Sequence, residues 1–543
     1  MKKYLIFLCL LYSVVLNGKE AVGNIYWVQF NTKINTPYLL SEPEYFLSHR
    51  ALARRERQNI AIDSTDLPVN PAFIDSLSTL GFYVKHTSKW MNGAIVELDA
   101  TISIDSILKP SFVDNYELRK GVSLKSASSK FSNIDSLQQV YYGNSLSQLS
   151  MIKGEILHEV ATGKGVHIAI IDAGFQNSNE LEVFDSLYKR GGVLGTYDFV
   201  LPGNDVYKEF YHGNAVFSIM AGNHPGQLIG SAPDASYWLL RTEDTASESP
   251  VEEDYWIIAA EFADQQGCDV INTSLGYSTF DNPEFNHNYE QFDGKTLRIS
   301  KAANLAVQKG MVVVCSAGNS GNDAWGHIVA PSEARDVLSI AAVDVNEKIT
   351  TFSSRGFSED WSILKPDVAA MGAGVTYTSS MGEFVTGNGT SFSSPIIAGM
   401  AACLIEYYPN KTSFEITEMI RSLGNYYPQH NIEYGFGIPD FSKALSTETL
   451  DTLNINTSKK SLSSHYSSTI YPNPFQTSFT INNSEDYTKF ELLNTSGERV
   501  FSTELNQSSV EISSSIVSNL QKGVYFAVFR GEHKVHSFKL MKY

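Results

Sequence analysis

The strongest constraint on the fold is a nearly unbroken apolar run, Val166–Ile171, that ends at Asp172-Ala173-Gly174. An apolar run without alternation is typical of a strand buried on both faces of a parallel sheet. Met311–Cys315 is a second run of the same kind. Ligands of open α/β sheets bind outside the carboxyl ends of the strands. The sequence therefore predicts an α/β domain built on a doubly wound parallel sheet, with functional residues just after these runs.

Three polar residues at the ends of predicted buried elements supply the groups of a nucleophilic triad. Asp172 follows the first strand, His212 opens an apolar helix, and Ser391 precedes a second apolar helix. An alcohol becomes a nucleophile when a base takes its proton, and the base needs a carboxylate to orient it. Singly, these residues are ordinary for a turn, a helix cap and a helix N-cap. Together, in these positions, they favour catalysis.

A fourth polar group follows the run Met311–Cys315. The segment Ser316–Gly321 reads Ser-Ala-Gly-Asn-Ser-Gly, which is typical of a turn at the end of a strand. A side-chain amide on such a turn can donate to the oxyanion of a tetrahedral intermediate, beside the backbone N–H of Ser391. Asn319 is therefore the candidate oxyanion donor.

These segments resemble the motifs of the subtilase family of serine endopeptidases, and the resemblance extends over about residues 145–445. The matching segments are Ile170–Gly174, His212-Gly213, Gly230–Ala235, Val270–Gly276, Ser316–Gly321 and Gly389-Thr390-Ser391. The chain order Asp, His, Ser is also that of subtilisin-type proteases. The resemblance implies a catalytic domain over 145–445 that hydrolyses peptide bonds through an acyl-enzyme. It further implies that six residues contact the substrate main chain and the primary specificity pocket: Ser274, Leu275, Gly276, Ser316, Ala317 and Gly318.

The sequence departs from the usual family pattern at two places. Asn214 and Ala215 stand where the family usually has Thr and His, and Phe392-Ser393-Ser394 stands where it usually has Met-Ala-Ala. Neither departure removes a catalytic group, so they bear on the packing around the site. The alternative to an active secreted endopeptidase is a catalytically inactive adhesin or binding protein of the same fold at the cell surface.

Other functional classes find little support in the sequence. His158-Glu159 has no second His at the spacing of a zinc-binding helix, and no metal site is predicted. The formal net charge of −18 argues against a nucleic acid partner. The triad chemistry requires no cofactor; structural calcium is common in the resembled family, but no acidic cluster assigns a site. We expect a monomer that acts on protein or peptide substrates.

The N-terminus predicts export. Met1-Lys2-Lys3 precedes an apolar stretch over Tyr4–Leu16 that is too short to span a bilayer, so residues 1–18 are predicted to be a secretory signal peptide. The remaining Cys268, Cys315 and Cys403 are too few for a disulfide framework. The expected location is outside the cell or on its outer surface.

Residues 19–140 are predicted to form a small α/β unit, with strands over Ile25–Phe30 and Ala94–Leu98 and a helix that begins at Asn70-Pro71. In arrangement and position this unit is similar to the inhibitory propeptides of secreted subtilases, which implies that it binds its own catalytic domain. A stable accessory domain is the alternative. Arg54–Arg57 could attract a processing protease, but its composition favours a solvated helix face. Release of the propeptide is expected in or after the polar stretch 123–130.

A linker rich in Ser, Thr and Asn over 446–468 separates a C-terminal module, 469–543. Short strands predicted over 478–481, 489–493, 499–501 and 523–530, with turn signals between them, indicate a β-sandwich. Tyr471–Pro474, Gly523-Val524-Tyr525 and Phe538–Lys542 resemble the C-terminal sorting domain of the type IX secretion system. The resemblance implies that this secretion machinery is a partner. The alternative is a sandwich that binds carbohydrate or a protein.

Overall fold

The computed structural model describes residues 23–99, 101–121, 141–357 and 363–445, and further segments over 469–471, 478–482, 488–494, 499–505, 509–512, 520, 523–530 and 535–542. The predicted signal peptide (1–18), the polar stretch 123–130 and the linker 446–468 lie outside the described residues. The chain divides into two compact units, Met1–Thr449 and Leu450–Tyr543.

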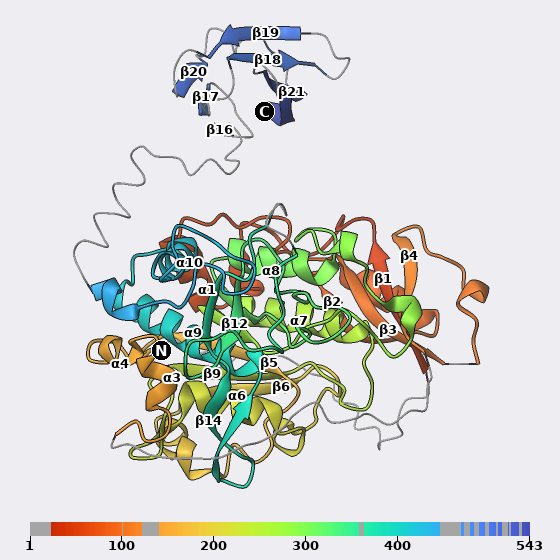
Figure 1. Cartoon of the computed structure of the whole chain (residues 1–543). Helices are drawn as coiled ribbons and strands as arrows, with labels where there is room; N and C mark the ends of the chain where they lie inside the picture. The colour runs from red at the N-terminus through yellow and green to blue at the C-terminus, as the bar shows by residue number, and fades with distance from the viewer. Residues whose placement is uncertain are drawn as a thin grey trace, which may run out of the picture. The chain divides into compact units, whose positions relative to one another are not determined.

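A seven-stranded sheet forms the centre of the first unit (Figure 1). Its spatial order is β13 (Val368–Met371), β12 (Leu338–Val343), β11 (Val312–Ser316), β10 (Val270–Thr273), β5 (His167–Asp172), β9 (Ser236–Arg241) and β6 (Val193–Asp198). Every neighbouring pair is parallel. The chain passes from β5 to β6 and β9 on one side and then to β10–β13 on the other. The predicted doubly wound parallel sheet is confirmed, and its switch point lies at the strand that ends in Asp172.

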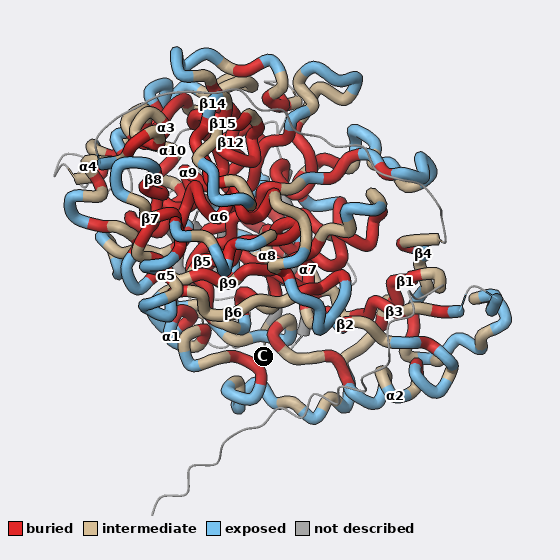
Figure 2. Tube along the Cα trace, turned by 90° about the horizontal axis from the view of Figure 1, so that it is seen from below, coloured by how far each residue is buried: buried red, intermediate tan, exposed pale blue. Residues whose placement is uncertain are grey.

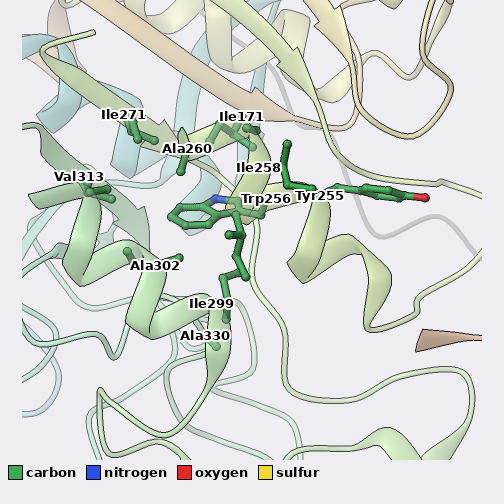
Figure 3. Close-up of a cluster of buried hydrophobic side chains, with 14 of the residues drawn as sticks. Ile171, Tyr255, Trp256, Ile258, Ala260, Ile271, Ile299, Ala302, Val313 and Ala330 are labelled. Carbon is green, nitrogen blue, oxygen red and sulfur yellow. The ribbon is translucent and has the colours of Figure 1, made fainter. Parts of the chain in front are cut away.

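Helices cover both faces of this sheet. On one face, α7 (Val251–Gln266) and α8 (Arg298–Gln308) pack against alternate strand residues, and Figure 3 shows Trp256 among Ile271, Val313 and Ala302. The Trp256 indole N–H donates to Thr273 Oγ1 at 2.9 Å.

On the other face lie α6 (His212–Ala221) and α9 (Thr390–Tyr407), the second of which contacts four neighbouring strands. Every residue of α6 is buried (Figure 2), which confirms the predicted core helix. Smaller elements complete the domain: α3 (Leu146–Ser150), α4 (Gly154–Leu157), α5 (Asp185–Lys189), β7 (Asn223–His224), β8 (Leu228–Ile229), β14 (Ala373–Thr378), β15 (Phe384–Asn388) and α10 (Ser413–Ser422).

The first part of the Met1–Thr449 unit, called the N-terminal unit below, is an antiparallel sheet with two helices. The sheet order is β2 (Tyr83–Ser88), β3 (Gly93–Asp99), β1 (Gly23–Phe30) and β4 (Val113–Lys120), and the helices are α1 (His49–Arg57) and α2 (Pro71–Thr79). The Asn70 side chain accepts a hydrogen bond from the backbone N–H of Ala72 at 3.0 Å, which caps α2. The predicted strands and the predicted helix start are confirmed.

The two faces of this N-terminal sheet have different partners. Tyr26 and Val28 of β1 share a core with Leu77 of α2. Ile25 and Trp27, which point to the other face, share the core of α7 and α8 instead. The Arg298 guanidinium of α8 lies 4.6 Å from the centre of the Trp27 ring. The N-terminal unit is therefore packed directly on the domain of the parallel sheet.

The prediction of a solvated helix face for Arg54–Arg57 is wrong for two of the arginines. The Arg54 and Arg55 side chains are 1% and 2% exposed, and both form ion pairs with Asp264 of α7, at 2.5 and 2.8 Å. Arg57 is 37% exposed. The pattern of a single helix does not reveal this partner, because Asp264 lies 210 residues from Arg54 in the sequence.

Glu261 of α7 binds the turn between β2 and β3. Its carboxylate accepts hydrogen bonds from Ser88 Oγ at 2.5 Å and from the backbone N–H groups of Lys89 and Trp90 at 2.8 and 3.1 Å. Burial raises the pKa of Glu261 to about 7, although the nearby charge of Lys89 acts in the opposite direction. Glu261 is thus protonated more readily when the N-terminal unit is docked on it than when its carboxyl group is exposed to water.

We expect the N-terminal unit to be held less firmly as pH rises from about 5 to about 7.5. Undocking exposes Glu261 and returns its pKa toward the ordinary carboxyl value. The stabilisation of the docked state that comes from protonated Glu261 is therefore fully present below pH about 4.5 and is lost as pH rises through about 7. The test is the dissociation rate of the cleaved N-terminal unit, measured by gel filtration at several pH values.

Glu261→Gln should flatten this pH dependence. Lys33, whose pKa burial lowers to about 8, also interacts with Glu261, so the measurements should stay below that pH. A wild-type dissociation rate that falls over the tested range would contradict the assignment to Glu261.

The C-terminal unit contains two sheets. One holds β16 (Thr469–Tyr471), β17 (Phe479–Asn482) and β20 (Ser509–Ile512); the other holds β19 (Arg499–Glu504), β18 (Lys489–Leu493), β21 (Gly523–Arg530) and β22 (Val535–Lys542). Phe479 and Ile481 from the first sheet share one core with Phe490, Leu492 and Phe529 from the second. This is the predicted β-sandwich, with β16, β20 and β22 in addition to the four predicted strands.

Cys268, Cys315 and Cys403 are buried free thiols. Burial raises the pKa of Cys403 well above its usual value, as expected for an unreactive thiol in a core. In the described part of the chain, we find no helix with the length and hydropathy needed to cross a membrane.

Candidate active site

Asp172 and His212 are joined by a hydrogen bond at the carboxyl edge of the parallel sheet. Asp172 is the last residue of β5 and is fully buried, and His212 is the first residue of α6. The distance from His212 Nδ1 to Asp172 Oδ1 is 2.7 Å. Because a carboxylate accepts this bond, the imidazole carries its proton on Nδ1, which leaves the lone pair of the neutral ring on Nε2.

A sharp turn after β5 makes this contact possible. Gly174 has φ of +144°, and a Cβ there would lie 2.5 Å from the backbone nitrogen of Phe210. The backbone N–H of Ala173 donates to Asp172 Oδ1 at 2.8 Å, which fixes the carboxylate. A glycine at position 174 is therefore required by the turn that follows β5.

Ser391 lies at the start of α9, close to His212. It is the second residue of the helix and is 6% exposed. The ring of the next residue, Phe392, stacks on the ring of His212 with centroids 6.1 Å apart. In this structure the Ser391 hydroxyl donates to the carbonyl of Ser274 at 3.2 Å. Catalytic hydrogen bonds of unliganded enzymes often form only with substrate, so this orientation is compatible with a nucleophile.

Asn319 has a fixed orientation. Its Oδ1 accepts from the backbone N–H of Thr390 at 2.9 Å and from the Thr390 hydroxyl at 3.0 Å. A backbone N–H can only donate, so the atom that it reaches must be the amide oxygen. The Nδ2 amine of Asn319 therefore points away from Thr390, and the residue is exposed.

Two nitrogen atoms that carry N–H donors lie near Gly389. A Cβ placed on this glycine would lie 3.7 Å from Asn319 Nδ2 and 3.7 Å from the backbone nitrogen of Ser391. The second donor is at the N-terminus of α9, where the helix dipole favours negative charge. This space next to Ser391 is thus suited to an oxyanion.

The six predicted substrate-binding residues form two neighbouring segments, of which the first follows β10 and the second begins at the last residue of β11. Ser316 Oγ lies 3.5 Å from the Leu275 carbonyl oxygen, its hydrogen-bond partner. Gly276 is exposed and borders Val329, whose Cγ2 would lie 2.1 Å from any Cβ at that position. The Ser274 carbonyl accepts from Ser391, and the Gly318 backbone N–H donates to Thr390 Oγ1 at 3.2 Å, so both segments lie beside the start of α9.

A hydrogen-bonded chain that the sequence did not predict fixes the first turn of α9. Ser394 Oγ donates to Asn272 Oδ1 at 2.8 Å, Asn272 Nδ2 donates to Ser274 Oγ at 3.1 Å, and Ser274 Oγ donates to the Ser391 carbonyl at 2.9 Å. Ser394 belongs to the departure from the family pattern. The available signal was Asn272, a polar residue in a strand that is buried throughout.

The other departures are also accommodated. Asn214 is fully buried and donates to the Thr378 carbonyl at 2.8 Å, which connects α6 to β14. The Phe392 ring stacks on Tyr377, with centroids 5.1 Å apart, in addition to His212. Asn214 and Phe392 thus both connect α6 or α9 to their neighbours around the site.

One group of carboxylates in the described part of the chain has its oxygens within 4.8 Å of one another: Glu243, Glu248 and Glu252. The Glu252 carboxylate accepts from the backbone N–H groups of Asp244 and Ser249, and Glu243 accepts from the Tyr277 hydroxyl. Burial raises the pKa of Glu252 well above its usual value. Protein donors already bind oxygens of Glu243 and Glu252, and we assign no metal to this cluster.

Comparisons with known proteins agree with this geometry. The model of the subtilase family matches residues 163–437, that of the Peptidase S8 propeptide domain of Bacteroidota matches residues 25–134, and that of a secretion system C-terminal sorting domain matches residues 469–543. These matches favour a propeptide over an accessory domain and a sorting domain over a binding module.

Individual relatives are more distant. Subtilisin E of Bacillus subtilis (strain 168) is 28% identical over 369 residues, which cover 67% of this chain and 83% of the relative. Thermitase of Thermoactinomyces vulgaris is 31% identical over 251 residues, 45% of this chain and 77% of the relative. Among solved structures, MycP1 from the ESX-1 type VII secretion system is 21% identical, with a TM-score of 0.47, over 59% of this chain and 91% of that one.

The subtilase match alone covers about half of the chain, and it spans the strands, helices and turns that bring Asp172, His212 and Ser391 together. The predicted serine endopeptidase activity is confirmed by this match and by the subtilisin relatives. The chain belongs to the subtilase family and is a secreted serine endopeptidase with an S8 propeptide domain and a type IX sorting domain.

Proposed function

We propose that Ser391 is the nucleophile of this endopeptidase, that His212 is its general base, and that Asp172 orients and stabilises the imidazole. The observation that carries the proposal is the 2.7 Å hydrogen bond between Asp172 and His212, formed at the carboxyl end of β5 beside the start of α9. An Asp–His pair next to a serine at a helix N-terminus is the arrangement that hydrolysis through an acyl-enzyme requires.

In the proposed reaction, Ser391 Oγ attacks the carbonyl carbon of the scissile peptide bond while its proton passes to His212 Nε2. The oxyanion that forms accepts hydrogen bonds from Asn319 Nδ2 and the backbone N–H of Ser391. The imidazolium gives its proton to the leaving amine as the C–N bond breaks. Water then attacks the acyl-enzyme, again with His212 as the base, and restores Ser391.

We assign the remaining parts of the chain as follows. Residues 1–18 direct export across the inner membrane, residues 19–140 inhibit the catalytic domain (145–445), and residues 469–543 engage the secretion machinery after the linker 446–468. The propeptide and sorting-domain matches support these roles. The substrate main chain pairs with Ser274–Gly276 and Ser316–Gly318 in extended form. An inactive adhesin is disfavoured, because an adhesin has no need for the two donors near Gly389.

Ser391→Ala should abolish peptide hydrolysis and labelling by a fluorophosphonate probe, since the triad acts as a unit. The matched control is Ser393→Ala on the same helix, which loses only a hydrogen bond to the Thr390 carbonyl and should keep its activity within about tenfold. Both are measured on processed protein with a small peptide substrate. Full activity of the Ser391 variant would refute the serine nucleophile.

Asn319→Ala should lower kcat by about 10²–10³ with little change in KM, a magnitude known for one such donor in a subtilisin. The control is Asn322→Ala, three residues away and exposed, whose side chain reaches only the Thr351 hydroxyl. If both variants show the same kcat, another group must bind the oxyanion.

Deletion from Tyr471 onward should leave an active protease that stays in the periplasm. The C-terminal unit has its own core and supplies none of the proposed catalytic groups, so its loss should not unfold the first unit. Activity is assayed separately in periplasmic and extracellular fractions. Unchanged export of the truncated chain would favour a binding role for the sandwich.

A further inference from the structure

Helix α1 of the propeptide does not pack on the propeptide's own sheet. It belongs to the segment between β1 and α2, and both Figure 1 and Figure 2 show it well away from β1, β3 and β4. Its cap residue Ser48 donates its backbone N–H to the Gln265 carbonyl, near the C-terminal end of α7, at 3.0 Å. The segment thus extends from the propeptide along the catalytic domain.

α1 follows the amino edge of the parallel sheet. Arg50 donates to the carbonyls of Gly165 and Gly267, each at 2.9 Å. Arg54 donates to the carbonyls of Cys268 and Lys309, the second at 3.2 Å. These four carbonyls immediately precede β5, β10 and β11, which are neighbours in the sheet.

Gln58, the residue after α1, also binds the domain of the parallel sheet. Its amide donates to the Gly310 carbonyl at 2.8 Å and accepts from the backbone N–H of Ser413, at the start of α10, at 2.9 Å. The proposed catalytic residue Asp172 ends β5, and the substrate-binding Ser316 ends β11. The candidate active site and α1 therefore lie at opposite ends of the same strands: the site at their carboxyl ends and α1 at their amino ends.

The contact is built from buried charges. Asp264 of α7 is fully buried and pairs with Arg54, Arg55 and, at 3.1 Å, Lys89. Burial opposes its ionisation, but these three cations outweigh that effect and hold the pKa of Asp264 well below its usual range. Arg55 also pairs with Asp66, at 3.0 Å, which extends the network within the propeptide.

Removing one partner of a buried ion pair is costly, because the remaining charge stays buried without compensation. Three cations, Arg54 and Arg55 of α1 and Lys89 of the turn after β2, therefore depend on one acid of the catalytic domain, Asp264. None of these contacts involves a residue that we place in the catalytic or substrate-binding machinery.

We propose that α1 is a second anchor of the propeptide, which keeps it on the catalytic domain after the chain between the two has been cut. A substrate competes for the carboxyl edge of the sheet, and it has no access to the α1 contacts at the amino edge. Cleavage alone then does not free the enzyme, and release requires the loss of the Arg54–Asp264 contact. This inference depends on the propeptide assignment and not on which residue is the nucleophile.

The test uses the full chain with Ser391→Ala and a recognition sequence for an added protease inserted between residues 121 and 141. After the cut, gel filtration measures how fast the propeptide dissociates. We expect it to co-elute with the catalytic domain. Arg54→Met should speed dissociation by at least about tenfold, from the loss of a buried charge partner. Glu56→Ala, at an exposed position of the same helix, should change the rate by less than about twofold.

If Arg54→Met prevents folding, Gln58→Ala tests the same anchor with a milder change, because it removes only the bonds to Gly310 and Ser413. It should speed dissociation by about threefold or more. A contrasting variant is Lys120→Ala, which breaks the 2.5 Å ion pair with Asp244 near the other edge.

Two results would overturn the proposal. One is a cut propeptide that separates at once from the Ser391→Ala catalytic domain. The other is retention that depends on Lys120 and is insensitive to the Arg54 and Gln58 changes. Since the added protease makes the cut, neither result depends on the proposed triad, which the Ser391→Ala activity assay tests separately.

Discussion

Helix α7 is buried on two sides, and the catalytic domain and the propeptide both depend on it. Its apolar side, with Trp256, completes the core over the parallel sheet. Its other side carries Asp254, Glu261 and Asp264, each of which accepts hydrogen bonds from the propeptide. A helix buried all round is usually apolar. α7 combines the two kinds of face because propeptide groups satisfy its acids.

This division of α7 explains how one helix serves both the zymogen and the mature enzyme. Once the propeptide has left, the acidic face meets water, which solvates carboxylates well. In the docked state the same acids need complementary donors, and Arg119 and Arg54 supply two of them. A mismatched partner would bury uncompensated charge, at a cost of about 3–5 kcal/mol for each broken pair. The acidic face thus selects its own propeptide more than it adds to the stability of the mature fold.

The sequence was most informative where the structure is local. The apolar run Val166–Ile171 determines a strand, and the residue after it must lie at the carboxyl edge, so the position of Asp172 followed from pattern alone. The burial of Arg54 and Arg55 did not, because it depends on Asp264 more than two hundred residues away. Ser394 was noted only as a departure from the family pattern, and its hydrogen bond to Asn272 was not predicted, because the two residues are 122 positions apart. In the C-terminal unit, β16, β20 and β22 were missed, because a strand takes much of its stability from the neighbours with which it pairs, and these do not show in a local pattern.

The opposite edges of one sheet separate two tasks that a propeptide has to perform. β4 ends at Lys120, which pairs with Asp244, and Thr242, two residues before Asp244, donates its backbone N–H to the carbonyl of Asp172 at 3.0 Å. This end of the propeptide lies near the proposed catalytic residues, so it is the end with which a substrate can compete. α1 and Gln58 contact the segments before the strands, helix α7 and the start of α10, and they touch none of the residues proposed for catalysis or substrate binding. Retention at the amino edge can therefore be strong without disturbing the geometry of Asp172, His212 and Ser391, and inhibition at the carboxyl edge can be weak enough to yield to cleavage.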